Sequence, residues 1–442
     1  MNDSGLGQSH PVSAQMVNDD LVHTYYRHLD PEDRAGRTDD ELRRRVLAHV
    51  GAGSRRDVGE SSVTVESGDS GTLVFVVTDD MPFLVDSVTN EVLRHTKELS
   101  LVMHPTFVAQ RSDADGTLVG LLPVPASGPV ASGDTAAMPS LGAIAAPAGA
   151  HTVIESWICV EILDRLEPEA ALALEQGVAT VLHDVRAAVA DWQPMRARAR
   201  ELAAEIRGGS MPATAADAPE AAELLDWLDQ GNFTFLGYRE YALETTADGD
   251  SLRPLGETGL GLLRDAGTSS RPLRGAGKER ARETQALVLT TANRRSTVHR
   301  NVYLDYVGVK SFDAAGVVTG ERRFIGLFAS SALAAPVRSV PVVRTKVRNV
   351  LERSGFPANS HTGKDLLTIL ETYPREELFQ TDETTLSETV AGIMHLQERR
   401  RTRVFLREDT YGRFVSAIVF IPRDRYTTPV RLRVEEELRT SF

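Results

Sequence analysis

The stretch TLVFVVTDDMPFLVDSVTNEVLRHTKELSLVMHPTFVAQ, residues 72–110, decides the fold that we expect for this chain. An apolar run at each end predicts a strand. Between the two runs, Leu84, Val85, Val88 and Val92 recur at helical spacing, so a helix is expected to lay this face on a sheet. The order strand, helix, strand predicts a βαβ-type core.

An acidic pair, Asp79 and Asp80, precedes the expected helix. A carboxylate oxygen can accept hydrogen bonds from the free amides of a first helical turn, and Pro82 fits there because its missing N–H is not needed. Helix capping is the favoured interpretation of the pair, and general acid–base chemistry is the alternative.

Length and composition limit the number of domains, the partners and the location that this chain can have. A chain of 442 residues suggests about three domains at roughly 150 residues each. The net charge of -13 argues against non-specific binding to nucleic acid. The single cysteine, Cys159, excludes an intramolecular disulfide, and its apolar surroundings predict a buried thiol. No signal peptide and no apolar run of ~18 residues is visible, so a cytoplasmic location is expected.

The first half of the chain predicts an α+β sandwich with its helices on one face of a largely antiparallel sheet. Thr38 or Asp39 is expected to cap the second helix, and the turn at 113–116 predicts a hairpin. The other expected elements are helices at 17–26, 39–50, 168–192 and on to 207, and strands at 62–66, 117–122 and 151–163. A Pro-, Ala-, Gly- and Ser-rich stretch at 123–150 predicts a low-complexity insertion.

The second half predicts a sheet domain, a helical segment and a final strand pair. The expected strands are 233–243, 286–291, 303–312, 321–330, 403–407 and 413–421, and the expected helices are 220–230, 336–355, 364–373 and 383–400. The Glu-rich stretch 375–398 is interpreted as a solvated helix face. Residues 414–438 repeat the order strand, acidic loop with proline, and helix start, so we expect a second, truncated copy of the opening module.

Motifs for catalysis are not apparent. A dinucleotide-binding loop is formed neither by Gly259 and Gly261 nor by Gly51 and Gly53. The sequence has no histidines or cysteines at the spacing of a zinc site, and no serine between the glycines of a nucleophile elbow. Solitary histidines such as His104 are interpreted as surface or core residues whose ring nitrogens have hydrogen-bond partners, and not as ligands or catalytic groups.

One basic cluster is a candidate anion or acidic-effector site. The stretch 293–300 carries three arginines and His299, and Arg322 and Arg323 lie on a following strand. Guanidinium groups pair well with carboxylates. An exposed basic strand edge and a domain contact are the alternatives.

Five phrases resemble a known family. They are DDMPFLVDSV (79–88), FTFLGYREY (233–241), NRRSTVHRNVYLDYVGVKSFDAAG (293–316), GKDLLTILETYPREELFQ (363–380) and HLQERRRTRVFLREDTYGRFVSAIVFIPRDRYTT (395–428). They resemble the N-terminal segment of the large bacterial NAD-specific glutamate dehydrogenases, over about residues 21–442. In that family this segment holds ACT-like and PAS-like domains and helical motifs, and precedes a separate dehydrogenase domain.

The resemblance implies a multidomain α+β chain with an ACT-like, ferredoxin-type sandwich and a PAS-like or ACT-like sheet domain. The expected division is a disordered leader (1–16), N-terminal helices (17–66), a first ACT-like domain (67–207), a linker (208–219), a PAS-like domain (220–335), a helical motif (336–400) and the truncated start of a second ACT-like domain (401–442).

The resemblance also implies a regulatory and oligomerisation role without catalytic residues, metal or cofactor in this chain. The intact enzyme would oxidise L-glutamate to 2-oxoglutarate and ammonium, with NAD bound by its own downstream catalytic domain. A homo-oligomer is expected, with an amino-acid or dicarboxylate effector and without nucleic acid or membrane. A ligand-free scaffold and a stand-alone amino-acid sensor are the alternatives. The expected effector-binding residues are Asp80, Met81, Pro82, Asp86, Arg295, His299, Arg300, Pro422, Arg423 and Asp424.

Overall fold

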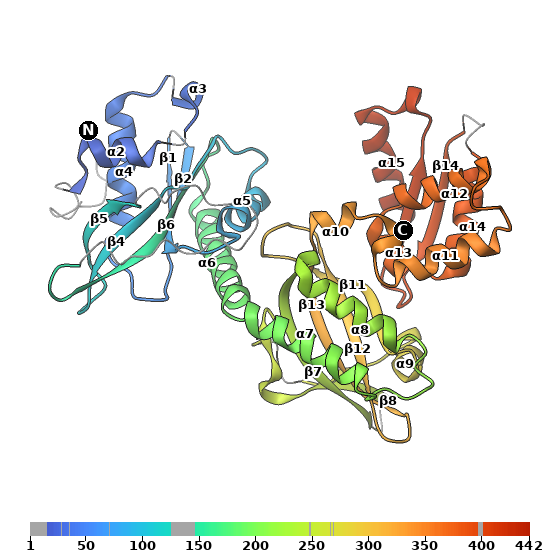
Figure 1. The fold of residues 1–442 in the computed structure, drawn as a ribbon. Helices are drawn as coiled ribbons and strands as arrows, with labels where there is room; N and C mark the ends of the chain where they lie inside the picture. Colours follow the sequence, from blue (N-terminus) through green and yellow to red (C-terminus); the bar gives the residue numbers. More distant parts are fainter. Residues whose placement is uncertain are drawn as a thin grey trace. The chain divides into compact units, whose positions relative to one another are not determined.

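The computed structural model describes residues 16–124, 146–246, 249–396 and 401–442, apart from positions 28, 35, 70, 266 and 268. The predicted leader, except for Met16, and most of the predicted insertion lie outside the described residues. The chain divides into two compact units. The first comprises residues 1–189 together with the short segment Ser296–Asn301, and the second comprises 190–295 and 302–442 (Figure 1).

The first unit is built around a sheet whose described strands follow the order β1-β2-β6-β4-β5, with β3 also paired to β6. Every pairing among these strands is antiparallel. Its elements are α2 (Asp19–Tyr25), α3 (Pro31–Arg34), α4 (Asp39–Ala52), β1 (Ser62–Gly68), β2 (Gly71–Asp79), α5 (Leu84–His95), β3 (Leu101–Met103), β4 (Thr106–Ser112), β5 (Leu118–Pro123), β6 (Ala150–Ile162) and α6 (Pro168–Ala190).

The opening stretch forms the expected strand, helix and strand. β2 and β4 both run antiparallel to β6, which lies between them, so β2 and β4 are parallel to each other. The second predicted strand is interrupted at His104 and Pro105, and β3 and β4 pair with β6 in one continuous register. Proline has no N–H to donate to a strand ladder, which explains the break.

Helices cover both faces of this sheet, so the prediction of helices on one face is wrong (Figure 1). Phe75 and Val77 of β2 pack into a core with α2 and α4. Val74 and Val76, which are also buried, point to the opposite face, because side chains alternate along a strand. α5 and α6 lie on that face. Thr38, one of the two residues predicted to cap α4, caps this helix in a capping box with Glu41.

A buried ion-pair network joins the first unit's sheet to the chain after α4. Glu155 is fully buried and accepts hydrogen bonds from Arg111 Nη2 (2.9 Å), Arg56 Nη2 (2.6 Å) and Trp157 Nε1 (3.1 Å). Arg56 also donates to Asp79 (2.8 Å). Charges that are buried together in this way satisfy one another's hydrogen-bonding groups, and loss of one partner leaves the others uncompensated.

The second unit contains a sheet whose described strands follow the order β10-β8-β7-β13-β12-β11, with β9 paired to β7. The elements up to the end of this sheet are α7 (Trp192–Arg207), α8 (Ala218–Trp227), a π-helical turn (Leu228–Asn232), β7 (Phe233–Thr246), β8 (Gly249–Pro254), a 3-10 turn (Gly256–Thr258), β9 (Leu260–Gly261), β10 (Arg271–Pro272), α9 (Ala276–Arg282), β11 (Leu287–Arg295), β12 (Tyr303–Phe312) and β13 (Val318–Phe328). The four strands predicted here are confirmed as β7, β11, β12 and β13.

A helical segment and a hairpin complete the second unit. They comprise α10 (Ser330–Ala334), a 3-10 turn (Val337–Ser339), α11 (Val343–Arg353), α12 (His361–Thr372), α13 (Arg375–Gln380), α14 (Glu383–Met394), β14 (Arg403–Glu408), β15 (Val415–Phe420), a 3-10 turn (Arg423–Arg425) and α15 (Thr428–Ser441). The strand, loop and helix predicted at 414–438 are confirmed as β15, the 3-10 turn and α15. The stretch 375–398 has a solvated face, because Glu376 and Glu388 are exposed, but it also has a buried one, which includes Arg375, Leu378 and Phe379 of α13.

Candidate functional site

The acidic pair before α5 does not cap the helix. The residue at the N-cap is Phe83, which has a positive φ of 71° and makes no side-chain capping bond. Asp79 instead pairs with Arg56 and Arg186. Burial acts to raise the pKa of Asp79, but hydrogen bonds from the two arginines hold it below its usual range. Asp80 accepts a hydrogen bond from Ser156 Oγ, and its N–H donates to the carbonyl of Ile154 (3.0 Å).

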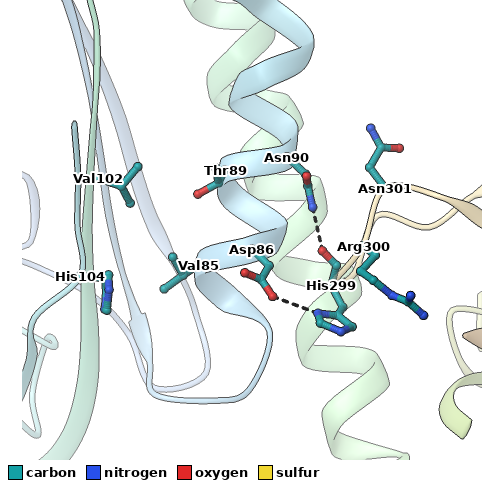
Figure 2. Close-up of a pocket in the computed structure, with 9 residues that line it drawn as sticks. All are labelled: Val85, Asp86, Thr89, Asn90, Val102, His104, His299, Arg300 and Asn301. Atoms are coloured by element: carbon teal, nitrogen blue, oxygen red, sulfur yellow. Dashed lines mark hydrogen bonds and ion pairs between the residues drawn. The ribbon is translucent and has the colours of Figure 1, made fainter. Parts of the chain in front are cut away.

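One side of α5 binds the segment Ser296–Asn301 of the first unit. The N–H of His299 donates to Ser87 Oγ (2.9 Å), and the carbonyl of His299 accepts from Asn90 Nδ2 (2.7 Å). The imidazole Nδ1 of His299 lies 2.9 Å from Asp86 Oδ2, and its ring centre lies 5.1 Å from that of Phe83. α5 therefore binds both the backbone and the side chain of His299 (Figure 2).

His299 has a positive φ of 66°, a conformation that costs a non-glycine residue on the order of 1 kcal/mol or more. The segment around it is held by further bonds: Ser296 Oγ bridges to Val298, and Thr297 Oγ1 donates to Asp184 (2.6 Å). Together these contacts stabilise a backbone conformation that is unfavourable in isolation. A strained residue that is held in this way often marks a ligand-binding position.

A cavity of about 580 Å³ opens beside this contact (Figure 2). Its lining comes from α5, from β3 and the residue that follows it, and from the segment Ser296–Asn301. The lining residues are Val85, Asp86, Thr89, Asn90, Val102, His104, His299, Arg300 and Asn301. A volume of this order is typical of small-molecule sites.

The cavity combines charged, polar and apolar groups. Asp86 supplies a carboxylate whose side chain is 60% exposed, and His299 and Arg300 supply basic groups. Thr89 Oγ1 is buried and has no hydrogen-bond partner among the described residues. Val85 and Val102 supply apolar surface. This lining suits a small polar molecule with a short apolar part.

Three of the predicted effector-binding residues, Asp86, His299 and Arg300, line this cavity. The other predicted residues do not line it. Met81 and Pro82 lie in the loop before α5, and Arg295 stacks on the ring of Tyr303 at 4.9 Å. Pro422, Arg423 and Asp424 lie at the 3-10 turn between β15 and α15.

Two arginines of the predicted basic cluster have their partners within the second unit. Arg322 pairs with Glu205. Arg323 is enclosed by the rings of Tyr241 (4.0 Å) and Tyr306 (4.8 Å) and pairs with Glu321 (3.2 Å). These two side chains are used inside the second unit.

Sequence reasoning missed Thr89, Asn90, His104 and Asn301. Thr89 and Asn90 follow Asp86 by three and four residues, which places all three side chains on one face of a helix. This spacing could have predicted Thr89 and Asn90 from the sequence. His104 was interpreted as an ordinary strand-end histidine, and nothing local connects it to residue 301. The described residues contain no group of three or more His, Cys, Asp or Glu side chains placed to hold a metal ion. None of the described helices is long and apolar enough to span a bilayer.

Models of glutamate dehydrogenase segments match three parts of this chain. The ACT1 domain model matches residues 21–178, helical motif 1 matches residues 340–399, and the ACT2 domain model matches residues 403–442. The α5 and His104 parts of the cavity fall within the ACT1 match.

Relatives over most of the chain carry one name, NAD-specific glutamate dehydrogenase. The chain is 33% identical to the protein from Halomonas elongata over 95% of its own length, 37% identical to that from Pseudomonas aeruginosa over 83%, and 32% identical to that from Mycobacterium tuberculosis over 89%. It spans only 26%, 22% and 22% of the lengths of these relatives. Together, the matches assign the chain to the large NAD-specific glutamate dehydrogenases, as an N-terminal segment with ACT domains and a helical motif.

Proposed function

We propose that this chain is a non-catalytic regulatory segment of a large NAD-dependent glutamate dehydrogenase. The intact protein would convert L-glutamate, NAD and water to 2-oxoglutarate, ammonium and NADH in a downstream catalytic domain, which would also hold the NAD. The names of the relatives and the ACT1 match support this assignment.

The observation that carries the regulatory role is the cavity against α5. It lies within the region that matches the ACT1 domain and is lined by a carboxylate, basic groups and a buried hydroxyl. An amino-acid or dicarboxylate effector is of a size and polarity that this lining can accommodate. Allosteric control would require that the effector bind two states of the enzyme with different affinities.

The predicted division of the chain is kept as part of this proposal, including the PAS-like assignment of residues 220–335. Of the predicted effector-binding residues, we assign Asp86, His299 and Arg300 to the cavity. The residues of the loop before α5, Arg295 and residues 422–424 stay predictions.

Two measurements on the 442-residue chain test the proposal. An assay of NAD reduction with L-glutamate should show no turnover, and turnover would contradict the non-catalytic role. Isothermal titration calorimetry with free amino acids and dicarboxylates should show saturable heat for at least one of them. Absence of heat with every compound would favour a ligand-free scaffold.

The scaffold is the second candidate function. The hairpin β14–β15 exposes Val404, Leu406 and Val415, which are 42%, 49% and 38% exposed. Neighbouring exposed apolar side chains of this kind are a feature of association surfaces. Light scattering on the chain would show whether it forms a homo-oligomer, and the reading frame after codon 442 would distinguish a segment of a longer enzyme from a stand-alone sensor.

A further inference from the structure

The connection between β11 and β12 belongs to a different unit from the strands that it joins. Residues 296–301 lie in the first unit, whereas β11 and β12 lie in the second. We call this segment, Ser296–Asn301, the latch. Within it Ser296 and Val298 are buried, and the side chain of His299 is 32% exposed. The latch is therefore a packed part of the first unit, although its neighbours in the sequence form a sheet of the second.

Two helices hold the latch. α5 binds His299 by the two backbone hydrogen bonds and the imidazole contact described above. α6 adds the bond from Thr297 Oγ1 to Asp184 Oδ2 (2.6 Å). The contact between His299 and Asp86 is partly exposed, and salt weakens such a pair. Each of these contacts by itself adds little to stability, because water competes for the same groups.

A second set of bonds is internal to the latch. Ser296 Oγ donates to the carbonyl of Val298 (2.7 Å) and accepts from the N–H of the same residue (3.1 Å). These two bonds require neither α5 nor α6. They hold residues 296–298 in one turn, so the latch can move as a single piece.

The backbone of His299 opposes docking. Its φ of 66° lies in the left-handed region, where the Cβ of an L-residue is crowded. The N–H and the carbonyl of His299 both bond to α5, so the docked geometry requires this conformation. When the latch leaves α5, His299 can return to an ordinary conformation and the strain is removed.

The pairing of β11 with β12 is irregular next to the latch. Residues 292–294 of β11 lie opposite residue 304 of β12 alone, because the register shifts between Thr291 and Arg295. Extra residues of this kind interrupt the hydrogen-bond ladder and let a strand bend. At the other end of the latch, Val302 is exposed and precedes β12. The latch can therefore move without disruption of the paired part of the sheet.

We propose that the latch is reversible: it leaves and rejoins α5 as one piece while α5 and the β11–β12 ladder stay folded. His299, Arg300 and Asn301 line the cavity, so release of the latch removes one wall of the cavity (Figure 2). Release also frees the β11–β12 connection from α5. A molecule that contacts α5 and the latch together would hold the latch closed and restrain this connection. The device does not rest on the effector role, because its contacts are all made within the chain.

Hydrogen exchange followed by mass spectrometry tests the proposal on the 442-residue chain. The amides at 298–301 should exchange at least about 100-fold faster than those of Val88 in α5 and Val307 in β12, which are buried. Low concentrations of urea should leave the rate at 298–301 unchanged, because a local opening exposes little new surface.

Two results of this measurement would overturn the proposal. If residues 298–301 exchange at the rate of Val307 and with the same dependence on urea, the latch opens only when the sheet unfolds. If they exchange without any protection, the segment is not docked on α5 in solution.

A pair of variants isolates the backbone strain. His299→Gly and His299→Ala both delete the imidazole and its contact with Asp86, but only alanine has a Cβ that disfavours the left-handed conformation. Exchange at 298–301 should be about 5-fold slower in His299→Gly than in His299→Ala. Equal or faster exchange in His299→Gly would show that the backbone conformation does not oppose docking, and the proposal would be wrong.

A variant of α5 separates movement of the latch from movement of the helix. Asn90→Ala deletes the donor to the carbonyl of His299 and should speed exchange at 298–301 about 5-fold, while Val88 and Val307 change by less than about 2-fold. Thr96→Ala, at the C-terminal end of α5, is the matched control and should leave all of these amides unchanged. If Val88 loosens as much as residues 298–301 in Asn90→Ala, α5 and the latch move together and the proposal fails.

Discussion

The imidazole Nδ1 of His299 lies 2.9 Å from the carboxylate Oδ2 of Asp86, although 213 positions separate the two residues in the chain. The pair is partly exposed, so its direct contribution to stability is small, about 0.2–1 kcal/mol. The backbone bonds of His299 to Ser87 and Asn90 accompany it. The contact is therefore a local docking of one segment on α5, and it places basic groups beside the cavity.

Ser87→Ala should loosen this docking. The N–H of His299 loses its acceptor, at a cost of about 1 kcal/mol, and exchange of the amides at 298–301 should become roughly 5-fold faster. Hydrogen exchange followed by mass spectrometry measures this change. Thr96→Ala, at the other end of α5, is the control and should leave these amides unchanged. Equal protection of 298–301 in both variants would show that Ser87 does not hold the segment.

Glu155→Gln should destabilise the first unit by about 3–5 kcal/mol, because it leaves Arg111 buried without a counter-charge and leaves Arg56 with Asp79 alone. Urea denaturation gives the free energy of unfolding, and hydrogen exchange of β6 assigns the transition to this unit. Asp69→Asn removes a carboxylate from an exposed pair with Arg165 and should cost less than about 1 kcal/mol. Similar losses in the two variants would contradict the role of the buried network.

His49 should make the stability of the first unit depend on pH. Burial lowers its pKa from 6.5 to about 3, while Tyr25 Oη lies 2.7 Å from Nδ1 and the carbonyl of Val76 lies 3.2 Å from Nε2. Between pH 6.5 and about 3 the unfolded chain binds a proton that the folded chain does not. The free energy of unfolding should then fall with falling pH by up to about 1.4 kcal/mol per unit.

The matched variant for this prediction is His49→Gln, which has no titratable ring. Urea denaturation between pH 4 and 7 should give a shallower pH dependence for the variant than for the unmodified chain. Parallel pH profiles would show that other groups cause the acid sensitivity.

Alanine substitutions at Gly51, in the last turn of α4, and at Gly53, its C-cap residue, should change the stability of the first unit in opposite directions. A Cβ at Gly53 would lie 2.7 Å from a ring carbon of the buried Trp157 and 2.9 Å from a methyl of Val77, so Gly53→Ala should destabilise the first unit by about 1–3 kcal/mol. A Cβ at Gly51 would meet no atom within 4 Å. Gly51→Ala should stabilise α4 by about 0.5–1 kcal/mol. Thermal unfolding of the two variants measures both signs, and a shared sign would contradict the packing described at Gly53.

Local patterns were sufficient for most of the elements. Helical spacing predicted α5, a capping signature at Thr38 predicted the start of α4, and turn signals predicted the hairpin of β4 and β5. The same approach missed β8 and α13. α13 has only six residues, too few to show a helical period. Its two glutamates favoured a solvated interpretation, although Arg375 and Phe379 are buried, because the composition of a short stretch does not indicate which other elements pack against it.

The sequence by itself determined the family, the mixed α+β architecture and the identity of residues 72–110 as a strand, helix and strand, because these depend on spacing along the chain. Only the tertiary structure decided what that stretch does. Side chains of Asp79 and Asp80 bond to distant Arg56, Arg186 and Ser156 in place of the helix amides. The cavity likewise requires His104 and the segment at 299–301, and no local periodicity can report a contact over some 200 residues.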